Sequence, residues 1–184
     1  ERTNIFECGD WSSHFHGVAA SDLFITSNRT NVETWDSTTA ENVSSIRVNV
    51  EIVSAAIDQS GKFLVVAREN DDDLRVYETD TSDRVGTCYG EHQAEVETVV
   101  AGSTKEIFLS LDADGLLVVW QIPSGQMLRK QSLNVRAPQS FVLSPCGAKA
   151  YISAWSNLDD EVGVIVVVDV ETLSVIRRIP VENR

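Results

Sequence analysis

The sequence predicts an all-β protein built from four similar antiparallel units of four strands each. Apolar and β-branched residues recur in short runs, separated by segments that contain Gly, Asp and Ser, as strands and turns require. No stretch shows a sustained helical period with capping residues, so almost no helix is expected. A repeat is indicated by four similar third-strand endings, spaced 42, 43 and 48 residues apart: Trp35-Asp36, Tyr77-Glu78, Trp120-Gln121 and Val168-Asp169.

The clearest unit lies within residues 91–120. Apolar residues outline three of its strands, near residues 96–101, 107–111 and 116–120. The second and third strands are joined by Asp112-Ala113-Asp114-Gly115, a tight hairpin turn with Gly at the position that favours positive φ. The unit is therefore a β-meander, and the other units are variations on it.

The same pattern places the remaining strands in order. The first unit has strands near residues 15–20, 23–27, 32–36 and 43–48, and the second near 52–57, 63–67, 74–77 and 84–89. The third unit ends with a strand near 127–133, and the fourth has strands near 139–143, 150–154, 164–169 and 175–180. Gly61 and Gly147 lie in matching hairpin loops between a first and a second strand.

Four residues of the clearest unit suggest an internal brace. His92 precedes the first strand by four residues, Ser110 lies on the second strand, Asp114 lies in the turn, and Trp120 ends the third strand. This arrangement resembles the WD40 repeat. The resemblance implies a β-propeller blade in which Trp120, Ser110, His92 and Asp114 form a chain of hydrogen bonds. Such a chain would satisfy the indole N–H and both imidazole nitrogens.

The resemblance extends to the whole chain, although the fourth unit, residues 151–181, is more similar to the YVTN-type propeller repeat. Blades of about 40–45 residues are typical of propellers. Both families imply a ring of seven or eight blades, so the four blades are expected to be part of such a ring. The rest would come from the same longer chain or from a second chain. The expected blades are residues 9–49, 50–90, 91–134 and 135–184, and residues 3–8 are a possible outer strand of a preceding blade.

Composition excludes several classes of partner. The 184-residue chain has a formal net charge of −13. Nucleic acids and anionic membrane surfaces attract an excess of Lys and Arg, so neither is expected as a direct partner. The charge instead favours basic protein segments through long-range attraction. No apolar run approaches the ~18 residues of a membrane helix.

Motifs for catalysis are absent from the sequence, which has no nucleophile elbow, P-loop, dinucleotide-binding fingerprint or HExxH. The three cysteines, Cys8, Cys88 and Cys146, are far apart, as is typical of buried thiols in a reduced protein. His14 and His16 could share one strand face but lack a third metal ligand. We therefore expect a non-enzymatic protein of the cytoplasm or nucleus, without a cofactor or metal.

Acidic residues gather in the loops between second and third strands. Equivalent loops of a propeller emerge on one face of the disc, so they would form an acidic crescent there. Such loops are either simply solvated or bind a Lys- and Arg-rich segment. An exposed tryptophan in the longest loop could anchor an interface, although Trp is also a common core residue. The candidate partner-binding residues are Asp71, Asp72, Asp73, Trp155, Asp159, Asp160 and Glu161, and Asp112 and Asp114 share their loop position.

Two functional hypotheses follow. The first is a WD-repeat-like propeller that acts as a non-catalytic scaffold for protein–protein interactions within a larger complex. The second is a YVTN-like propeller of a bacterial or extracytoplasmic protein that binds a small ligand or a redox partner. The fourth unit favours the second hypothesis, and a glycan on the sequon residues Asn28 or Asn42 would indicate a secretory protein.

Overall fold

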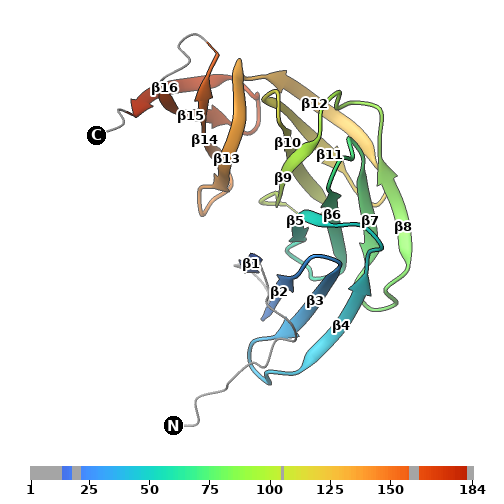
Figure 1. The fold of residues 1–184 in the computed structure, drawn as a ribbon. Helices are drawn as coiled ribbons and strands as arrows, with labels where there is room; N and C mark the ends of the chain where they lie inside the picture. Colours follow the sequence, from blue (N-terminus) through green and yellow to red (C-terminus); the bar gives the residue numbers. More distant parts are fainter. Residues whose placement is uncertain (1–13, 18–21, 105, 158–161, 182–184) are drawn as a thin grey trace.

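The computed structural model describes residues 14–17, 22–104, 106–157 and 162–181, the first of these segments by its backbone alone. Within these residues the chain forms four antiparallel sheets of four strands and no helix. The described part accordingly offers no helix that could cross a membrane. Figure 1 shows the sheets as successive blades of an open arc. The predicted all-β architecture of four-stranded propeller blades is confirmed.

Each blade is a meander whose strands pair in chain order. The first blade consists of β1 (His14–Gly17), β2 (Leu23–Ser27), β3 (Asn31–Asp36) and β4 (Asn42–Arg47). The second consists of β5 (Ile52–Ile57), β6 (Phe63–Arg68), β7 (Leu74–Glu78) and β8 (Arg84–Cys88). The third consists of β9 (Val96–Ala101), β10 (Ile107–Asp112), β11 (Leu116–Gln121) and β12 (Gln126–Ser132). The fourth consists of β13 (Val135–Leu143), β14 (Lys149–Ser156), β15 (Gly163–Asp169) and β16 (Val175–Val181).

The first strand of the fourth blade is longer than predicted. Its predicted start was residue 139, directly after Pro138, which cannot donate a ladder hydrogen bond. The structure accommodates Pro138 in an irregularity, where the register with β14 shifts between Arg136 and Ser140. Strand β13 therefore already begins at Val135. The predicted strand at residues 3–8 lies outside the described residues.

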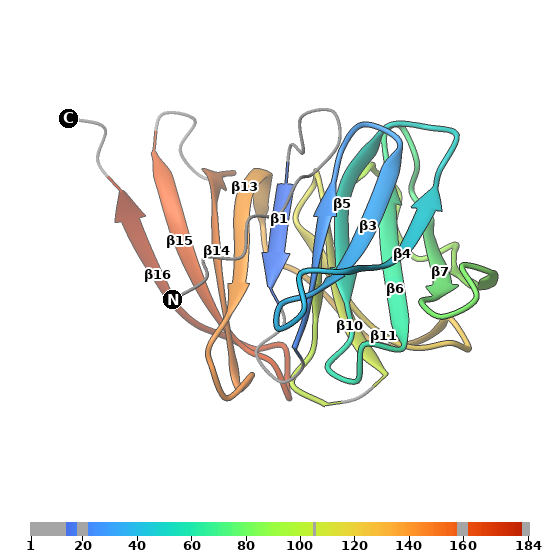
Figure 2. The same cartoon turned by 90° about the horizontal axis from the view of Figure 1, so that it is seen from below.

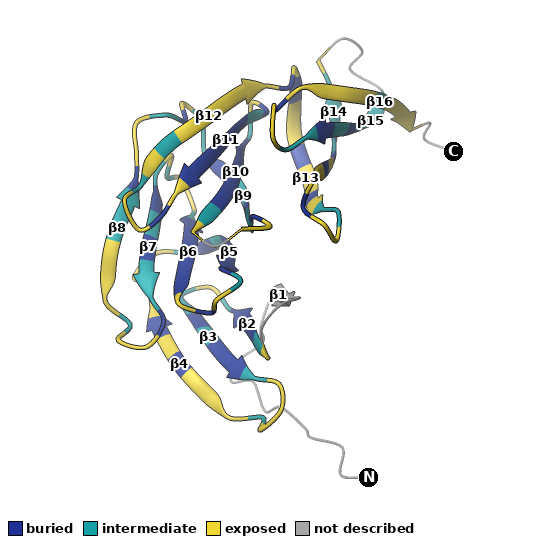
Figure 3. Ribbon diagram, turned by 180° about the vertical axis from the view of Figure 1, so that it is seen from behind, coloured by how far each residue is buried: buried dark blue, intermediate teal, exposed yellow. Residues whose placement is uncertain are grey.

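Strand order fixes which parts of each blade meet solvent. The first strands β5, β9 and β13 lie on the concave side of the arc, and the fourth strands lie on its convex side (Figure 1). The fourth strands are largely exposed, whereas the middle strands are buried (Figure 3). Seen from the side, the strands run from one face of the arc to the other, so turns occupy both faces (Figure 2).

Apolar side chains fill the space between successive blades. Ile25, Val65 and Leu109 occupy the same position on the second strand of blades one, two and three, and each is fully buried by the following blade. Because middle strands are covered on both faces, their sequences are nearly continuous apolar runs rather than alternating ones. Burial of this kind is the main contribution to propeller stability.

Backbone hydrogen bonds repeat from blade to blade on one face of the arc. The carbonyl groups of Arg29, Asp71 and Ala113, each in a turn between second and third strands, accept from the N–H groups of the following blade. The donors are Ile52, Val96 and Ala137, at N···O distances of 2.8, 3.2 and 2.9 Å. These bonds hold each turn to its neighbour and give this face a fixed backbone.

The outer hairpin of every blade turns in the same way. In each turn one residue has a left-handed conformation, namely Ala40, Ser82, Gly125 and Leu173, with φ between 56° and 71°. The residue four positions earlier is the second residue of the repeated third-strand ending, namely Asp36, Glu78, Gln121 and Asp169. Asp36 accepts from the N–H groups of Thr38 and Thr39 at 2.7 and 2.9 Å, and these bonds lower the pKa of its carboxyl. The acidic residue at this position thus stabilises the turn.

Candidate functional site

The face that carries the repeated backbone bonds also carries the predicted functional residues. In a meander, the turn between strands two and three and the connection to the next blade lie at the same end of the sheet. On blades two and three these segments are residues 69–73, 89–95 and 112–115, which we call the turn platform.

The connection within the platform is held between the two turns. The N–H of Asn70 donates to Glu95 Oε1 at 2.8 Å, and the N–H of Val96 donates to the Asp71 carbonyl at 3.2 Å. On the other side, the N–H of Ala113 donates to the Glu95 carbonyl at 2.9 Å. Residues 89–95 are therefore ordered by both blades, and side chains on them are presented from a fixed backbone.

A chain of buried side chains supports the platform from below. Trp120 Nε1 lies 2.7 Å from Ser110 Oγ, which lies 2.7 Å from His92 Nε2. His92 Nδ1 lies 2.9 Å from Asp112 Oδ2. The prediction that Asp114 is the fourth member is wrong. Asp114 is exposed in the turn, and Asp112 is the carboxylate that contacts His92.

The donors of this chain run in one direction. The indole N–H can only donate and the Asp112 carboxylate can only accept. Ser110 therefore accepts from Trp120, and His92 Nδ1–H donates to Asp112. In the neutral tautomer with its proton on Nδ1, His92 Nε2 accepts from the Ser110 hydroxyl. The second Asp112 oxygen accepts from the N–H of Leu116 at 2.8 Å. Every polar side-chain group in this series of hydrogen bonds therefore has a partner, as burial requires.

Strand alternation explains why Asp112 is the carboxylate. Residues two apart on a strand share a face, so Asp112, the last residue of β10, points to the same side as Ser110. Asp114 lies beyond the end of the strand, so strand alternation does not direct its side chain toward His92. The alternation from Ser110 was the signal in the sequence that could have identified Asp112.

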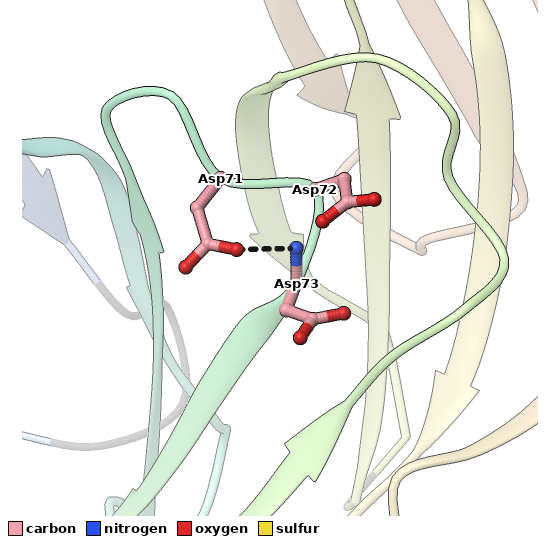
Figure 4. A group of neighbouring side chains, drawn as sticks. All are labelled: Asp71, Asp72 and Asp73. Carbon is pink, nitrogen blue, oxygen red and sulfur yellow. Dashed lines mark hydrogen bonds between the residues drawn. The ribbon is translucent and has the colours of Figure 1, made fainter.

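Three consecutive aspartates form the acidic turn of blade two (Figure 4). Their carboxylate oxygens lie within 4.8 Å of one another, and Asp71 Oδ1 accepts from the N–H of Asp73 at 3.1 Å. Asp71 is paired with Arg68 and, at 3.5 Å, with Arg75, which also lies 3.4 Å from Asp73. These arginines neutralise much of the charge, so the turn is balanced internally rather than organised as a cation site.

Within the described residues, the predicted acidic crescent offers fewer free carboxylates than the sequence suggested. Asp112 is buried in the brace, and Asp71 and Asp73 are ion-paired. Asp72 and Asp114 remain exposed on the platform. The other predicted members, Asp159, Asp160 and Glu161, lie outside the described residues. The local excess of carboxylates still has an effect, because burial and the charge of Glu95 raise the pKa of Glu97 on β9.

Tyr89 is a platform residue that sequence reasoning missed. It follows the last residue of β8 and is 71% exposed, the highest value among the large hydrophobic residues described. The sequence prediction placed it inside the strand. Its signal was the adjacent Gly90, which has a positive φ of 76° and ends the strand.

Trp155 does not begin a loop, as the sequence had suggested. It lies near the end of β14, opposite Arg136 on β13 and Gly163 on β15, and it is half-buried. The prediction stopped the strand at residue 154 and so placed Trp155 in the following hairpin. The residue lies on the face of blade four that points away from blade three, which we call the outer face of blade four, and not on the turn platform.

Comparisons with known proteins identify the fold only. No protein-family model matches the chain, and no curated protein sequence matches it. Among solved structures, hydrazine synthase from Kuenenia stuttgartiensis is similar, with a TM-score of 0.78 and 13% sequence identity over 98% of this chain. The chain spans about half of that structure's chain, 52% of its length. Because 1449 solved chains resemble this one, the fold is too widely shared to indicate a reaction.

Proposed function

We propose that this chain is a non-catalytic, WD-repeat-like propeller that acts as a scaffold for protein–protein interactions within a larger complex, and that the turn platform binds a partner. Tyr89 carries the proposal. A tyrosine exposed to 71% presents a large ring to solvent, and residues of this type are enriched among the residues that dominate interface energies. Its segment is already ordered, which lowers the entropic cost of binding.

The charge around Tyr89 favours a partner with a basic segment. Asp72, Gln93 and Asp114 are exposed on the same platform, and the chain as a whole carries a net charge of −13. Carboxylates around an aromatic anchor would attract Lys and Arg side chains and increase the association rate. The internal pairs of Asp71 and Asp73 leave Asp72 and Asp114 as the residues available to a partner.

Variants of three exposed positions test this proposal. The tagged wild-type protein, Tyr89→Ala and the double variant Asp72→Lys/Asp114→Lys are used to capture proteins from the source cells by cross-linking and quantitative mass spectrometry. Asp80→Lys is the matched control, because Asp80 is an exposed aspartate in the β7–β8 turn on the opposite face of blade two.

We expect the same proteins to be captured by the wild type and Asp80→Lys, and about tenfold less by each platform variant, which corresponds to roughly 1.4 kcal/mol. Raising the salt concentration should reduce capture by the wild type more than capture by the charge-reversed variant. Salt screens the attraction between carboxylates and a basic partner, and the variant lacks that attraction. Equal capture by all four proteins would refute the platform as the binding surface.

The fourth blade supports a second candidate function, a YVTN-like propeller that binds a small ligand or a redox partner. Val168 and Ile152 occupy the positions held by Trp120 and Ser110 in blade three, so this blade lacks the WD-like hydrogen-bond chain. The similar solved structure is named as an enzyme. Native mass spectrometry of the protein from its own source distinguishes the candidates: a small molecule retained by the protein would favour the second, and protein subunits alone would favour the first.

A further inference from the structure

Blade four has an apolar face that no other described part of the chain covers. Strand β15 contains the run Val-Ile-Val-Val-Val at residues 164–168, and such continuous apolar runs are typical of strands that are covered on both faces. One face packs against blade three through Val164, Val166 and Val168. The opposite face carries Val142, Tyr151, Trp155, Ile165, Val167 and Ile179, which are only half-buried or exposed.

The position of Tyr151, on the second strand of this face, is buried in every preceding blade. Tyr151 occupies the position of Ile25, Val65 and Leu109, as the sheet registers show. Those three residues are 0% exposed because the next blade covers them, whereas Tyr151 is 39% exposed. On the first strand, Val142 lies opposite Tyr151 and is 53% exposed. Blade four therefore keeps the apolar chemistry of a blade-to-blade interface without the blade.

A polar residue on the first strand indicates what kind of structure fits this face. In blade two, Ser54 Oγ accepts from the N–H of Val99 on β9, at 3.1 Å. Ser54 pairs with Ala67 on its second strand, and Ser140 has the equivalent place opposite Ser153. Ser140 is exposed. It is thus positioned to accept from a backbone N–H of a following first strand, as Ser54 accepts from Val99.

We infer that the outer face of blade four is the docking surface for a fifth four-stranded β-blade, contributed by a continuation of the same polypeptide. The three blade-to-blade interfaces within the arc show how such a blade would dock. In each of them, one face of a blade packs against the apolar second and third strands of the previous blade. A second copy of the chain fits less well, because Phe24 and Trp35, which face away from blade two, are only 8% exposed and already have contacts.

Cysteine labelling of the intact protein from its own source tests this inference. Val142→Cys reports on the docking surface. Val85→Cys is the matched control, because Val85 is 42% exposed on the outer strand β8, at the convex rim. Maleimide labelling of each site is measured by peptide mass spectrometry under native conditions, and the denatured mass of the same polypeptide is recorded.

The expected result is labelling of Val142→Cys at least tenfold slower than labelling of Val85→Cys, on a polypeptide heavier than the 20.3 kDa of these 184 residues. Equal labelling rates would overturn the inference. Protection of Val142→Cys on a polypeptide of 20.3 kDa would also overturn it, because the cover would then be a separate chain.

A measurement without substitutions covers the case in which Val142→Cys does not accumulate. Hydroxyl-radical footprinting of the unmodified protein should modify Tyr151 at least tenfold more slowly in the native state than in urea, because a fifth blade would cover a side chain that is otherwise 39% exposed. Similar rates in the two states would overturn the inference. The result does not depend on the proposed function, because Tyr151 lies on blade four and outside the turn platform.

Discussion

His92 joins two blade-three strands to the connection that precedes them. Its two ring nitrogens contact Ser110 and Asp112, on β10, while Trp120 on β11 reaches the same hydroxyl. All four side chains are at most 3% exposed. Buried polar chains of this type are stabilising only while every member has a partner.

Replacement of His92 by Ala should therefore destabilise the protein strongly. The substitution leaves the Asp112 carboxylate and the Ser110 hydroxyl buried without their partner, at a cost of about 2–4 kcal/mol in the free energy of unfolding. Urea unfolding followed by tryptophan fluorescence measures it. Asp114→Asn is the control and should change the free energy by less than about 0.5 kcal/mol, since Asp114 is exposed. Equal losses in the two variants would contradict the brace.

The brace could be predicted in part because it depends on residue types at fixed spacings. Histidine, serine and tryptophan were identified through the resemblance of their spacing to the WD40 repeat. The carboxylate was not, because Asp112 and Asp114 lie in the same turn and only the sheet register separates them. Blade one contains a shorter version, in which Trp35 Nε1 donates to Thr26 Oγ1 at 3.0 Å. Its hydroxyl was overlooked, since this blade has no histidine four residues before its first strand, as His92 is in blade three.

The two described cysteines should differ sharply in reactivity. Burial, with a contribution from Asp73, raises the pKa of Cys88 to about 12, so its thiolate is not populated at neutral pH. Cys146 is exposed, and a hydrogen bond with Ser144 lowers the pKa of its thiol.

At pH 8 the native protein should react with iodoacetamide at Cys146 and not at Cys88, and both should react in urea, because the thiolate is the nucleophile. Peptide mass spectrometry gives the rates. Rapid alkylation of native Cys88 would show that this residue is not buried in the core between blades two and three.

The outer hairpins depend on close contact between neighbouring blades. Gly125, in the β11–β12 turn, has φ of 71°, and a Cβ there would lie 2.2 Å from the Thr87 carbonyl oxygen on β8. Gly90 has a similar φ of 76°, but nothing lies within 4 Å of its Cβ position. The two glycines therefore separate backbone strain from packing.

Gly125→Ala should cost more stability than Gly90→Ala. Each substitution carries about 1 kcal/mol of left-handed backbone strain, and Gly125→Ala adds about 1–3 kcal/mol of overpacking against a backbone that cannot yield easily. Thermal unfolding of the two variants measures the difference. Equal melting temperatures would mean that the turn does not pack on β8.

Strands were predictable where apolar runs and Gly-containing turns agree, as in β5 and β9, whose predicted and observed bounds are the same. They were less so at β13 and β14. The predicted start of β13 lies after Pro138, but a local register shift carries the strand through that residue. The end of β14 could not be placed because Trp155 and Ser156 fit both a strand and a loop, and only their pairing with β13 decides.

Taken together, the blades form an arc whose two ends differ. At blade one the side chains that face outward are covered, and at blade four they are not. Hydrophobic burial between blades depends on which sheets are neighbours, and no local sequence pattern contains that information. The sequence could therefore indicate a larger ring without showing which blade face was open. The turn platform likewise depends on two blades meeting, because its connection is bonded to both.

The most direct measurement of the platform's role is site-specific photo-cross-linking in the source cells. A photoreactive phenylalanine analogue is placed at position 89, and in a control at position 80 on the opposite face. We predict that the analogue at Tyr89 is joined to a partner protein through a Lys- or Arg-rich peptide, and that the analogue at Asp80 is not. Cross-links to the same protein from both positions, or from neither, would contradict the proposal that this propeller binds its partner through the turn platform.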